Sequence, residues 1–240
     1  MYKFKKIFKF MFNLLFPGRC DLCLKELSCH EHIRICRKCI ASLKVIAEER
    51  VCSLCAHPLR YNSCPSCCSL DLQVERNSSL FYNQGYEQAF LYSFKFKNKP
   101  SYASVIADLS VNYINFSEYD CLVPVPLNRH SLFRRDYCQV KTVAAIISRR
   151  TGIPFYDAVW KKDSRKDTAQ HFKNRNARQK ELKGCYLFKK KYRPKLEGRK
   201  ILIVDDIFTT GSTINTVALE LKKNLSNVNI SSFTFARSLL

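Results

Sequence analysis

The chain has 240 residues, of which 46% are hydrophobic, and its formal net charge is +21. This length can bury a sizeable core as one large domain or as one domain with a small module, and the hydrophobic content excludes a wholly disordered chain. Between Arg129 and Lys200 alone there are 22 Lys and Arg residues against six Asp and Glu. This excess of positive charge favours binding to a polyanion, namely nucleic acid, anionic lipid or a phosphorylated substrate. The alternative is a surface whose charge only repels other copies of the protein.

Residues 1–19 form a basic amphipathic N-terminal segment. Lysines are interleaved with Phe, Ile and Leu up to Phe16, in a stretch that is too short and too charged to span a bilayer. Residues 1–16 fit a peripheral contact with an anionic membrane surface. They fit equally well a helix whose aromatic face packs against the cysteine-rich module that follows. Pro17 and Gly18 end the segment.

Cysteines dominate residues 20–77. Ten of the 13 cysteines lie between Cys20 and Cys68, and eight of them form four Cys-x-x-Cys pairs. Four such pairs at this density predict a double zinc ribbon with two structural Zn²⁺ ions, because each pair supplies one edge of a tetrahedron. The simplest grouping is Cys20, Cys23, Cys36 and Cys39 on one ion and Cys52, Cys55, Cys64 and Cys67 on the other, with Cys68 as an alternative to Cys67 and with Cys29 or His32 as alternatives at the first site.

Two other interpretations of these cysteines are disulfides and iron–sulfur ligation. Disulfides fit a secreted module, but no cleavable signal peptide precedes the cysteines, so we expect a cytoplasmic protein with reduced thiols. Iron–sulfur ligation is the remaining alternative. Because the module is too small to bury a core by itself, we expect the metals to supply its stability.

Residues 78–240 alternate between strand and helix patterns. Short apolar runs predict strands over 79–82, 121–125, 201–204 and 228–235. Helical spacing predicts helices over 101–114, over 140–150 and from residue 214 onward. The aromatic segment 86–96 has no clear period, and residues 163–195 are basic and weakly periodic. The alternation predicts an α/β domain with a doubly wound parallel sheet.

The most informative stretch is 201–213, ILIVDDIFTTGST. Four apolar residues indicate a strand buried on both faces, and Asp205 and Asp206 follow where ligand sites lie in open α/β sheets. A loop of hydroxyl residues with one glycine then leads into a helix, which is an arrangement suited to a phosphate. The loop residues are Thr209, Thr210, Gly211, Ser212 and Thr213.

This pattern closely resembles the ribose-phosphate signature of the type I phosphoribosyltransferases. The resemblance implies that Asp205 and Asp206 hold the ribose hydroxyls of phosphoribosyl pyrophosphate and that residues 209–213 bind its 5′-phosphate. It also implies that Mg²⁺ bridges the pyrophosphate and the ribose. On the pyrophosphate side, the turn after the second strand offers Arg129 and the later basic segment offers Arg175.

Over residues 17–238 the whole chain resembles the ComF family of competence-associated proteins. The shared order is the paired cysteines, an aromatic segment ending in Lys-Phe-Lys, a Val-Pro-Val-Pro strand end, a basic segment and the ribose-phosphate signature. The family implies a type I phosphoribosyltransferase-like fold behind a double zinc ribbon. It also implies a cytoplasmic role in DNA uptake during natural transformation, in which incoming single-stranded DNA is handled.

Three functions fit the sequence. The first is a protein that handles single-stranded DNA and has a phosphoribosyl pyrophosphate pocket. The bases of the DNA would stack on four aromatic residues, Phe94, Phe96, Tyr137 and Phe172. The second is an active phosphoribosyltransferase whose acceptor the sequence does not specify. The third is a zinc-ribbon adaptor that docks on a helicase or on an inner-membrane DNA channel component, with the protein held at the inner face of the membrane.

Overall fold

The computed structural model describes residues 18–27, 34–46, 50–59, 64–67, 71–96, 101–127, 138–162 and 184–239. In these ranges four strands form one parallel sheet in the order β1-β6-β5-β2. The strands are β1 Asn77–Tyr82, β2 Cys121–Pro124, β5 Lys200–Phe208 and β6 Asn229–Arg237. The predicted α/β class with a parallel sheet is confirmed.

Four longer helices connect the strands. They are α3 Gly85–Phe96, α4 Ser101–Tyr113, α6 Gln139–Thr151 and α9 Ser212–Asn224. An antiparallel pair, β3 Val159–Lys161 and β4 Tyr186–Phe188, lies outside the main sheet. The short helical elements are α2 Arg37–Ala41, η2 Phe116–Glu118, η3 Lys190–Tyr192 and α8 Arg193–Leu196. None of the helices in the described ranges is both long and apolar enough to cross a membrane.

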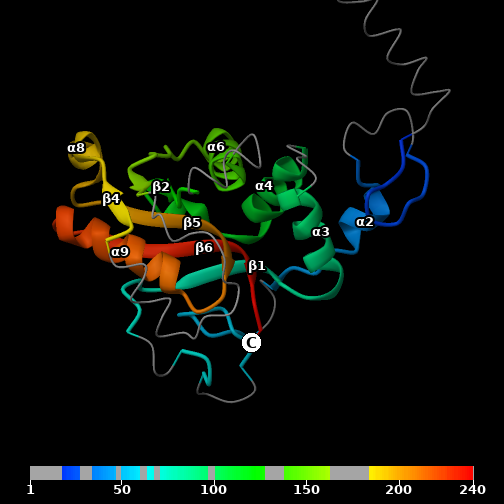
Figure 1. Cartoon of the computed structure of the whole chain (residues 1–240), viewed down its shortest axis with the longest axis horizontal. Coiled ribbons are helices and arrows are strands. Elements are labelled where there is room, and N and C mark those ends of the chain that lie inside the picture. The colour runs from blue at the N-terminus through cyan, green and yellow to red at the C-terminus, as the bar shows by residue number, and fades with distance from the viewer. Residues whose placement is uncertain are drawn as a thin grey trace, which may run out of the picture.

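Strand β5 is apolar along its first half because both of its faces are covered. Leu202 and Val204 belong to a core shared with α3, α4 and α6. Ile201 and Ile203 point the other way, into a core shared with α9 and the β3–β4 pair. Side chains of a strand alternate between faces, so a continuous apolar run is what a strand between two helical layers requires. Figure 1 shows α3, α4 and α6 on one side of the sheet and α9 on the other.

The two groups of paired cysteines pack against different faces of the sheet. Cys20 and Cys39 join the core under α3 and α4. Cys52 and Cys67 join the opposite core, beside α9. Figure 1 shows α2, which carries Cys39, next to α3. The cysteine-rich segments are therefore integrated into the packing of the α/β domain.

Irregular backbone pairs with part of each edge of the sheet. At the β1 edge, the N–H of Asn77 donates to the carbonyl oxygen of Ser53 at 2.8 Å. At the β2 edge, the N–H of Leu122 donates to Pro154, and its carbonyl oxygen accepts from Tyr156. Paired edges leave fewer backbone groups open to another strand.

The predicted elements are present, with altered ends. The aromatic segment 86–96, in which the sequence shows no clear hydrophobic period, forms the helix α3. Phe90, Leu91 and Phe94 are buried on one face of this helix. The prediction that the strand at 201 ends before the two acids is wrong, since β5 runs to Phe208. Helix α9 begins at Ser212, two residues earlier than predicted. The three-residue strands β3 and β4 were not predicted, because each is shorter than any periodic signal.

Candidate functional site

Two carboxylates lie in the second half of β5. Asp205 pairs in register with Thr234 of β6 and is buried, whereas Asp206 is partly exposed. Oδ1 of Asp205 accepts the N–H of Asp206 at 2.8 Å, and Oδ1 of Asp206 accepts the N–H of Ile207 at 2.6 Å. These local bonds hold each carboxylate close to its own backbone.

The buried acid has a strongly perturbed pKa. Burial and the neighbouring charge of Asp206 raise the pKa of Asp205 to about 8. The N–H of Asp206 and the charges of Lys95 and Lys161 act in the opposite direction. A carboxyl group whose ionised form is disfavoured by its surroundings marks a candidate functional site when it lies beside a second acid.

Lys95 of α3 reaches the same place. Its Nζ forms an ion pair with Oδ2 of Asp206 at 2.6 Å, and both side chains are mostly buried. The carbonyl oxygen of Lys95 accepts a hydrogen bond from the amide of buried Gln139 at 3.2 Å, which ties the end of α3 to the start of α6. In the sequence, Lys95 is apparent only as part of a Lys-Phe-Lys run, because its partner Asp206 lies far along the chain.

The β3–β4 pair supplies another basic and another aromatic residue. Tyr186 is buried, and its pKa is raised by burial and by the charges of Asp205 and Asp206, while a hydrogen bond with the side chain of Thr213 acts to lower it. Nζ of Lys161 lies 5.9 Å from the centre of the Tyr186 ring. Neither residue was singled out from the sequence, since nothing local distinguishes them.

A hydroxyl-rich loop joins β5 to α9. Gly211 has φ +74° and is the N-cap of α9. The hydroxyls of Thr210 and Ser212 are 2.7 Å apart, and the N–H of Ser212 donates to Oγ1 of Thr210 at 3.4 Å. Among the described residues, the backbone N–H groups of Thr210 and Gly211 have no acceptor. Open N–H groups at a helix N-terminus are the usual ligands of a phosphate.

The structure thus brings the predicted site residues of β5 and the loop to one end of the sheet. The carboxylates can accept hydrogen bonds from sugar hydroxyls, and the loop can donate to an anion. The predicted residues Arg129 and Arg175 lie outside the described ranges, as do residues 1–16 and the alternative ligands Cys29, His32 and Cys68. The prediction that bases stack on Phe94 is wrong, because Phe94 is buried, whereas Phe96 is exposed. Tyr137 and Phe172 lie outside the described ranges.

The eight paired cysteines form the two predicted groups. In the first group Cys20 and Cys39 have sulfurs 3.7 Å apart, and in the second group Cys52 and Cys67 have sulfurs 3.5 Å apart. All sulfurs within a group lie within 4.8 Å of one another. Tetrahedral zinc with Zn–S bonds of about 2.3 Å needs sulfurs roughly 3.8 Å apart. Each group of four cysteines could therefore hold one Zn²⁺ ion.

Each cysteine group contains one thiol of lowered pKa. Burial acts to raise the pKa of Cys20, but hydrogen bonds from backbone N–H groups, including those of Cys23 and Cys36, bring it down to about 7. Cys64 follows the same pattern, with N–H groups of Ser66 and Cys67 lowering its pKa to about 7 against burial. Backbone N–H groups aimed at sulfur stabilise the thiolate, which is the form that binds a metal.

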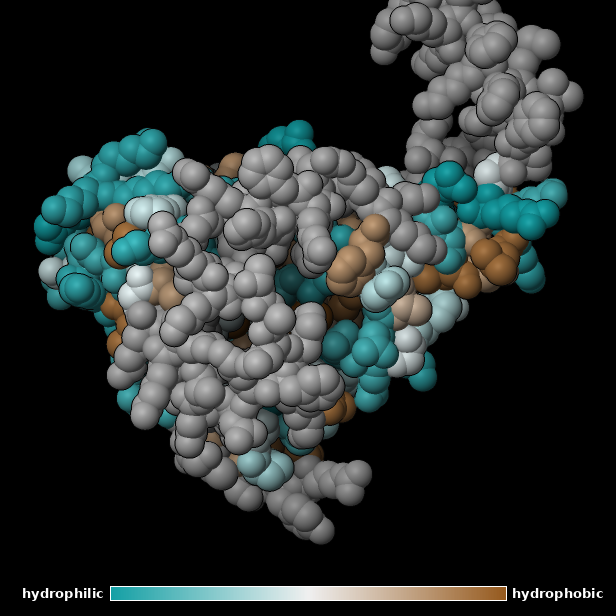
Figure 2. Space-filling model, viewed as in Figure 1, coloured by the Kyte–Doolittle hydropathy of each residue, from teal (hydrophilic) through white to brown (hydrophobic). Residues whose placement is uncertain are grey.

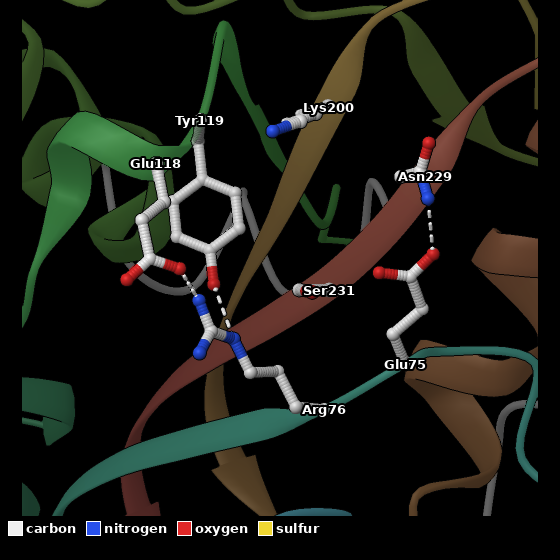
Figure 3. Close-up of a pocket in the computed structure, with 7 residues that line it drawn as sticks. All are labelled: Glu75, Arg76, Glu118, Tyr119, Lys200, Asn229 and Ser231. Carbon is white, nitrogen blue, oxygen red and sulfur yellow. Dashed lines mark hydrogen bonds and ion pairs between the residues drawn. The ribbon is translucent and has the colours of Figure 1, made fainter.

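A polar cavity of about 400 Å³ lies at the other end of the sheet, where β5 and β6 begin. Figure 3 shows Arg76 in contact with Glu118 and with the hydroxyl of Tyr119, and Asn229 donating to Glu75 at 2.6 Å. Because two carboxylates, Glu75 and Glu118, line this cavity and Arg76 is already paired, it is a weaker candidate for an anion site than the loop beside Gly211.

Comparison with known families and relatives agrees with these features. The family model described as phosphoribosyl transferase domain matches residues 141–237, which include both acids and the loop. Competence protein ComFC of Bacillus subtilis (strain 168) is 25% identical over 214 residues, covering 85% of each chain. Competence protein ComFC of Streptococcus pneumoniae is 27% identical over 186 residues, covering 76% of this chain and 79% of that protein.

Among solved structures, the chain is similar to glutamine phosphoribosylpyrophosphate amidotransferase from B. subtilis. The TM-score is 0.38 and the sequence identity is 14%, over 59% of this chain. The match covers 30% of that enzyme, so this chain spans less than a third of its length.

Proposed function

We propose that this chain is a ComF-family, phosphoribosyltransferase-like protein that binds phosphoribosyl pyrophosphate with Mg²⁺ and handles single-stranded DNA during DNA uptake. Its similarity to three competence proteins and its match to the phosphoribosyl transferase domain model support this proposal. The ribose hydroxyls would lie on Asp205 and Asp206, and the 5′-phosphate in the loop at residues 209–213. Bound Mg²⁺ would neutralise the pyrophosphate and hold it against the ribose.

One observation carries the sugar-phosphate part of this proposal. The carboxylates of Asp205 and Asp206 and the N-cap Gly211 lie within seven residues at one end of β5, in the region that the family model matches. The ion pair between Lys95 and Asp206 adds a cation to that region. A sugar that carries a phosphate and a pyrophosphate needs this combination of acceptors, donors and positive charge.

Calorimetry with phosphoribosyl pyrophosphate and Mg²⁺ tests the pocket. We expect saturable binding by the native protein and at least ten-fold weaker binding by the variant that combines Asp205→Asn with Asp206→Asn. Asp108→Asn serves as the control, because Asp108 is an exposed carboxylate on α4, a helix that carries no residue of the proposed pocket. Equal affinities of the native protein and the double variant would contradict the proposed pocket.

The DNA part of the proposal is supported by a surface that we call the basic patch, residues 189–195, KKKYRPK, over η3 and α8. Figure 2 shows hydrophilic surface gathered at the end of the molecule where α8 lies in Figure 1. Two tyrosines belong to this surface: Nζ of Lys191 is 5.1 Å from the Tyr192 ring, and Nζ of Lys195 is 5.4 Å from the Tyr156 ring. Cations that follow a phosphate backbone, interleaved with aromatic rings, suit an unpaired strand.

Salt titrations of oligonucleotide binding test the patch. Neutralising a phosphate contact lowers the slope of log affinity against log salt by roughly 0.7 for a single strand. We therefore expect the pair Lys190→Gln and Lys191→Gln to weaken binding and to lower the magnitude of that slope by about 1.4, which corresponds to two lost contacts. The pair Lys222→Gln and Lys223→Gln on α9 is the control, because those lysines are also adjacent and exposed. Equal slopes for both pairs would show that the patch does not bind the strand.

An active phosphoribosyltransferase is a second candidate, favoured by a pair of exposed rings near the site. Tyr92 and Phe96 on α3 have ring centroids 4.6 Å apart and are 60% and 59% exposed. They flank Lys95, which contacts Asp206. An acceptor base could stack there while its ring nitrogen faces the ribose.

Pyrophosphate release from phosphoribosyl pyrophosphate, measured with a panel of bases and amines, tests catalysis. We expect turnover with an aromatic acceptor to fall at least ten-fold when Tyr92→Ala and Phe96→Ala are combined. Tyr113→Ala controls for loss of an exposed tyrosine elsewhere. Absence of turnover across the panel would leave sugar-phosphate binding as the function of the pocket.

A protein partner, such as a helicase or an inner-membrane DNA channel component, has one structural indication. Leu24, beside the first cysteine group, is 70% exposed. Because it lies next to Cys23 in the turn of the first cysteine group, this leucine would offer a small apolar contact to a partner that docks on that turn. Capture of the helicase by the native protein, but not by Leu24→Ser, is the expected result in a pull-down.

A further inference from the structure

Arg237, at the end of β6, is a buried cation placed behind the phosphate loop. Its side chain is 2% exposed. Nη1 donates to the carbonyl oxygen of Phe208 at 3.1 Å, to that of Thr209 at 2.7 Å and to that of Ser238 at 2.5 Å. The guanidinium also lies 5.1 Å from the Phe208 ring. One side chain thus fixes the backbone at the point where β5 enters the loop.

The same guanidinium contacts the second cysteine group. Nη2 of Arg237 donates to Oγ of Ser66 at 2.5 Å. Ser66 lies inside the pair Cys64-x-x-Cys67, and its N–H is one of the groups that lower the pKa of Cys64. Within the described ranges, Arg237 therefore joins the loop to a turn that carries two of the four sulfurs.

Other contacts connect these two regions. Asn215, in the first turn of α9, accepts the N–H of Gln73 at 2.6 Å and donates to the carbonyl oxygen of Asp71 at 3.1 Å. Leu72 packs next to Gly211. The chain that leaves the second cysteine group therefore runs along the start of α9.

The first cysteine group has a different neighbourhood. Its segment packs against α4, where the hydroxyl of Tyr102 donates to Asp21 at 3.0 Å. Its buried cysteines belong to the core on the opposite face of the sheet from Phe208 and Ile214. The chain thus contains an internal control, namely a cysteine group of the same chemistry without a described contact to the loop.

The electrostatics of Arg237 also favour a bound anion. In the described part of the chain, its guanidinium is bound by carbonyl and hydroxyl oxygens, and its Nε has no partner. A buried charge without an opposite charge is costly, and an anion nearby in a region of low dielectric offsets this cost. A phosphate in the adjacent loop would supply that negative charge.

We propose that Arg237 is a positioning residue of the phosphate loop and that it couples metal occupancy of the second cysteine group to sugar-phosphate binding. This inference rests on the proposed sugar-phosphate pocket. The sulfurs of Cys64 and Cys67 would fix the turn that carries Ser66 when they bind a metal. Ser66 in turn positions the guanidinium of Arg237, and the guanidinium fixes the backbone of residues 208–209. Linkage requires the effect to be reciprocal, so the sugar phosphate must also retain the metal at the second group.

Zinc transfer from the full-length, zinc-loaded protein to a colorimetric chelator tests this reciprocity. Zinc should leave the two cysteine groups in two kinetic phases. Cys23→Ser weakens the first group and Cys55→Ser weakens the second, so these variants show which phase belongs to which group. We expect phosphoribosyl pyrophosphate with Mg²⁺ to slow release from the second group about five-fold or more and to leave the first group unchanged. Such a factor lies at the lower end of typical couplings.

Ser66→Ala is the mildest variant that interrupts the connection, and Ser53→Ala is its matched control, an exposed serine in the other turn of the same group. Ser66→Ala should abolish the slowing, and Ser53→Ala should preserve it. Arg237→Lys should partly restore the coupling that Arg237→Met removes, while circular dichroism monitors folding.

The outcomes separate this inference from the proposed function. If the native protein binds phosphoribosyl pyrophosphate in calorimetry but the ligand slows neither release phase, or slows both equally, the coupling through Arg237 is refuted and the pocket stands. If Ser66→Ala retains the slowing, Ser66 is not the connection and the inference fails. If the native protein does not bind the sugar phosphate at all, the pocket and the coupling fail together.

Discussion

Gly211 is the residue on which the shape of the phosphate loop depends most directly. Its φ of +74° is unfavourable for any other residue, and a Cβ there would lie 2.6 Å from Cζ of Phe208. Because the Phe208 ring lies under the guanidinium of Arg237, it has little room to move away. The position therefore combines backbone strain with a steric clash.

We expect Gly211→Ala to destabilise the protein by about 3 kcal/mol, from roughly 1–2 kcal/mol of left-handed strain and a further steric term. Gly198→Ala is the matched control, because Gly198 has φ +68° but open space around its Cα. Urea unfolding of both variants gives the difference. A loss for Gly198→Ala as large as for Gly211→Ala would show that the clash with Phe208 contributes nothing.

Asp205 gives the protein a pH dependence of definite sign. Its pKa is raised to about 8 in the folded protein, by burial and by Asp206, so the folded form keeps a proton that the unfolded form loses above about pH 4. The contribution of the Asp205 carboxyl group to the free energy of unfolding is fully present below about pH 4 and is lost as the pH rises toward 8. Asp205→Asn should therefore become progressively more stable than the native protein between pH 5 and pH 8, by at least about 1 kcal/mol. Urea midpoints at both pH values measure this, and a constant difference would contradict it.

At the scale of elements, Asp157 joins two parts of the domain. Its Oδ1 forms an ion pair with Nζ of Lys141 on α6 at 2.9 Å, and its Oδ2 forms one with Nζ of Lys189, next to β4, at 2.8 Å. Although burial acts to raise the pKa of Asp157, these two lysines lower it below its ordinary value. The contribution of this pair of bridges to stability is therefore present at neutral pH and is lost as the pH falls below about 4.

Asp157→Asn should lower the free energy of unfolding at pH 7 by about 1 kcal/mol and should have little effect near pH 3. Asp108→Asn is the control, since Asp108 pairs with Arg150 at an exposed position. Chemical unfolding at the two pH values compares the variants. A loss at pH 3 equal to that at pH 7 would mean that Asp157 acts through packing and not through its charge.

Most elements could be predicted from the sequence because their cause is local. The buried run 201–204 and the helical spacing of α4, α6 and α9 follow from patterning alone. The two acids, the glycine loop and the start of the helix follow one another without a gap in the sequence, so this part of the candidate site could also be predicted. The ion pair of Lys95 with Asp206 and the clamp of Arg237 on Thr209 were not, because each depends on a contact between distant parts of the chain.

The cysteine pattern shows the same limit. Spacing within each Cys-x-x-Cys turn predicted the two groups, since that geometry is fixed by four neighbouring residues. It did not reveal that the groups contribute to the cores on opposite faces of the sheet, because that depends on how the chain passes the edge of β1.

At the scale of the whole molecule, metal removal should destabilise more than the cysteine-rich segments. Buried cysteines of each group are part of one of the two cores, so metal removal would leave uncoordinated thiols packed against each face of the sheet. We expect a zinc chelator to lower the melting temperature of the entire α/β domain by 10 °C or more, on the order of several kcal/mol. The signal from Trp160, on β3, and the far-ultraviolet circular dichroism should shift together. Chelator saturated with zinc is the control, and an unchanged Trp160 transition would contradict the prediction.

The bond between Asn77 and Ser53 has a practical consequence for experiments on shortened forms. A protein that starts at residue 78 would present the outer side of β1 as an open template for strands of other molecules, and would tend to self-associate. If such a truncated protein no longer bound a partner, the cause could be its self-association and not the loss of a direct contact. Single substitutions that leave Ser53 in place are the sounder way to locate where a partner docks.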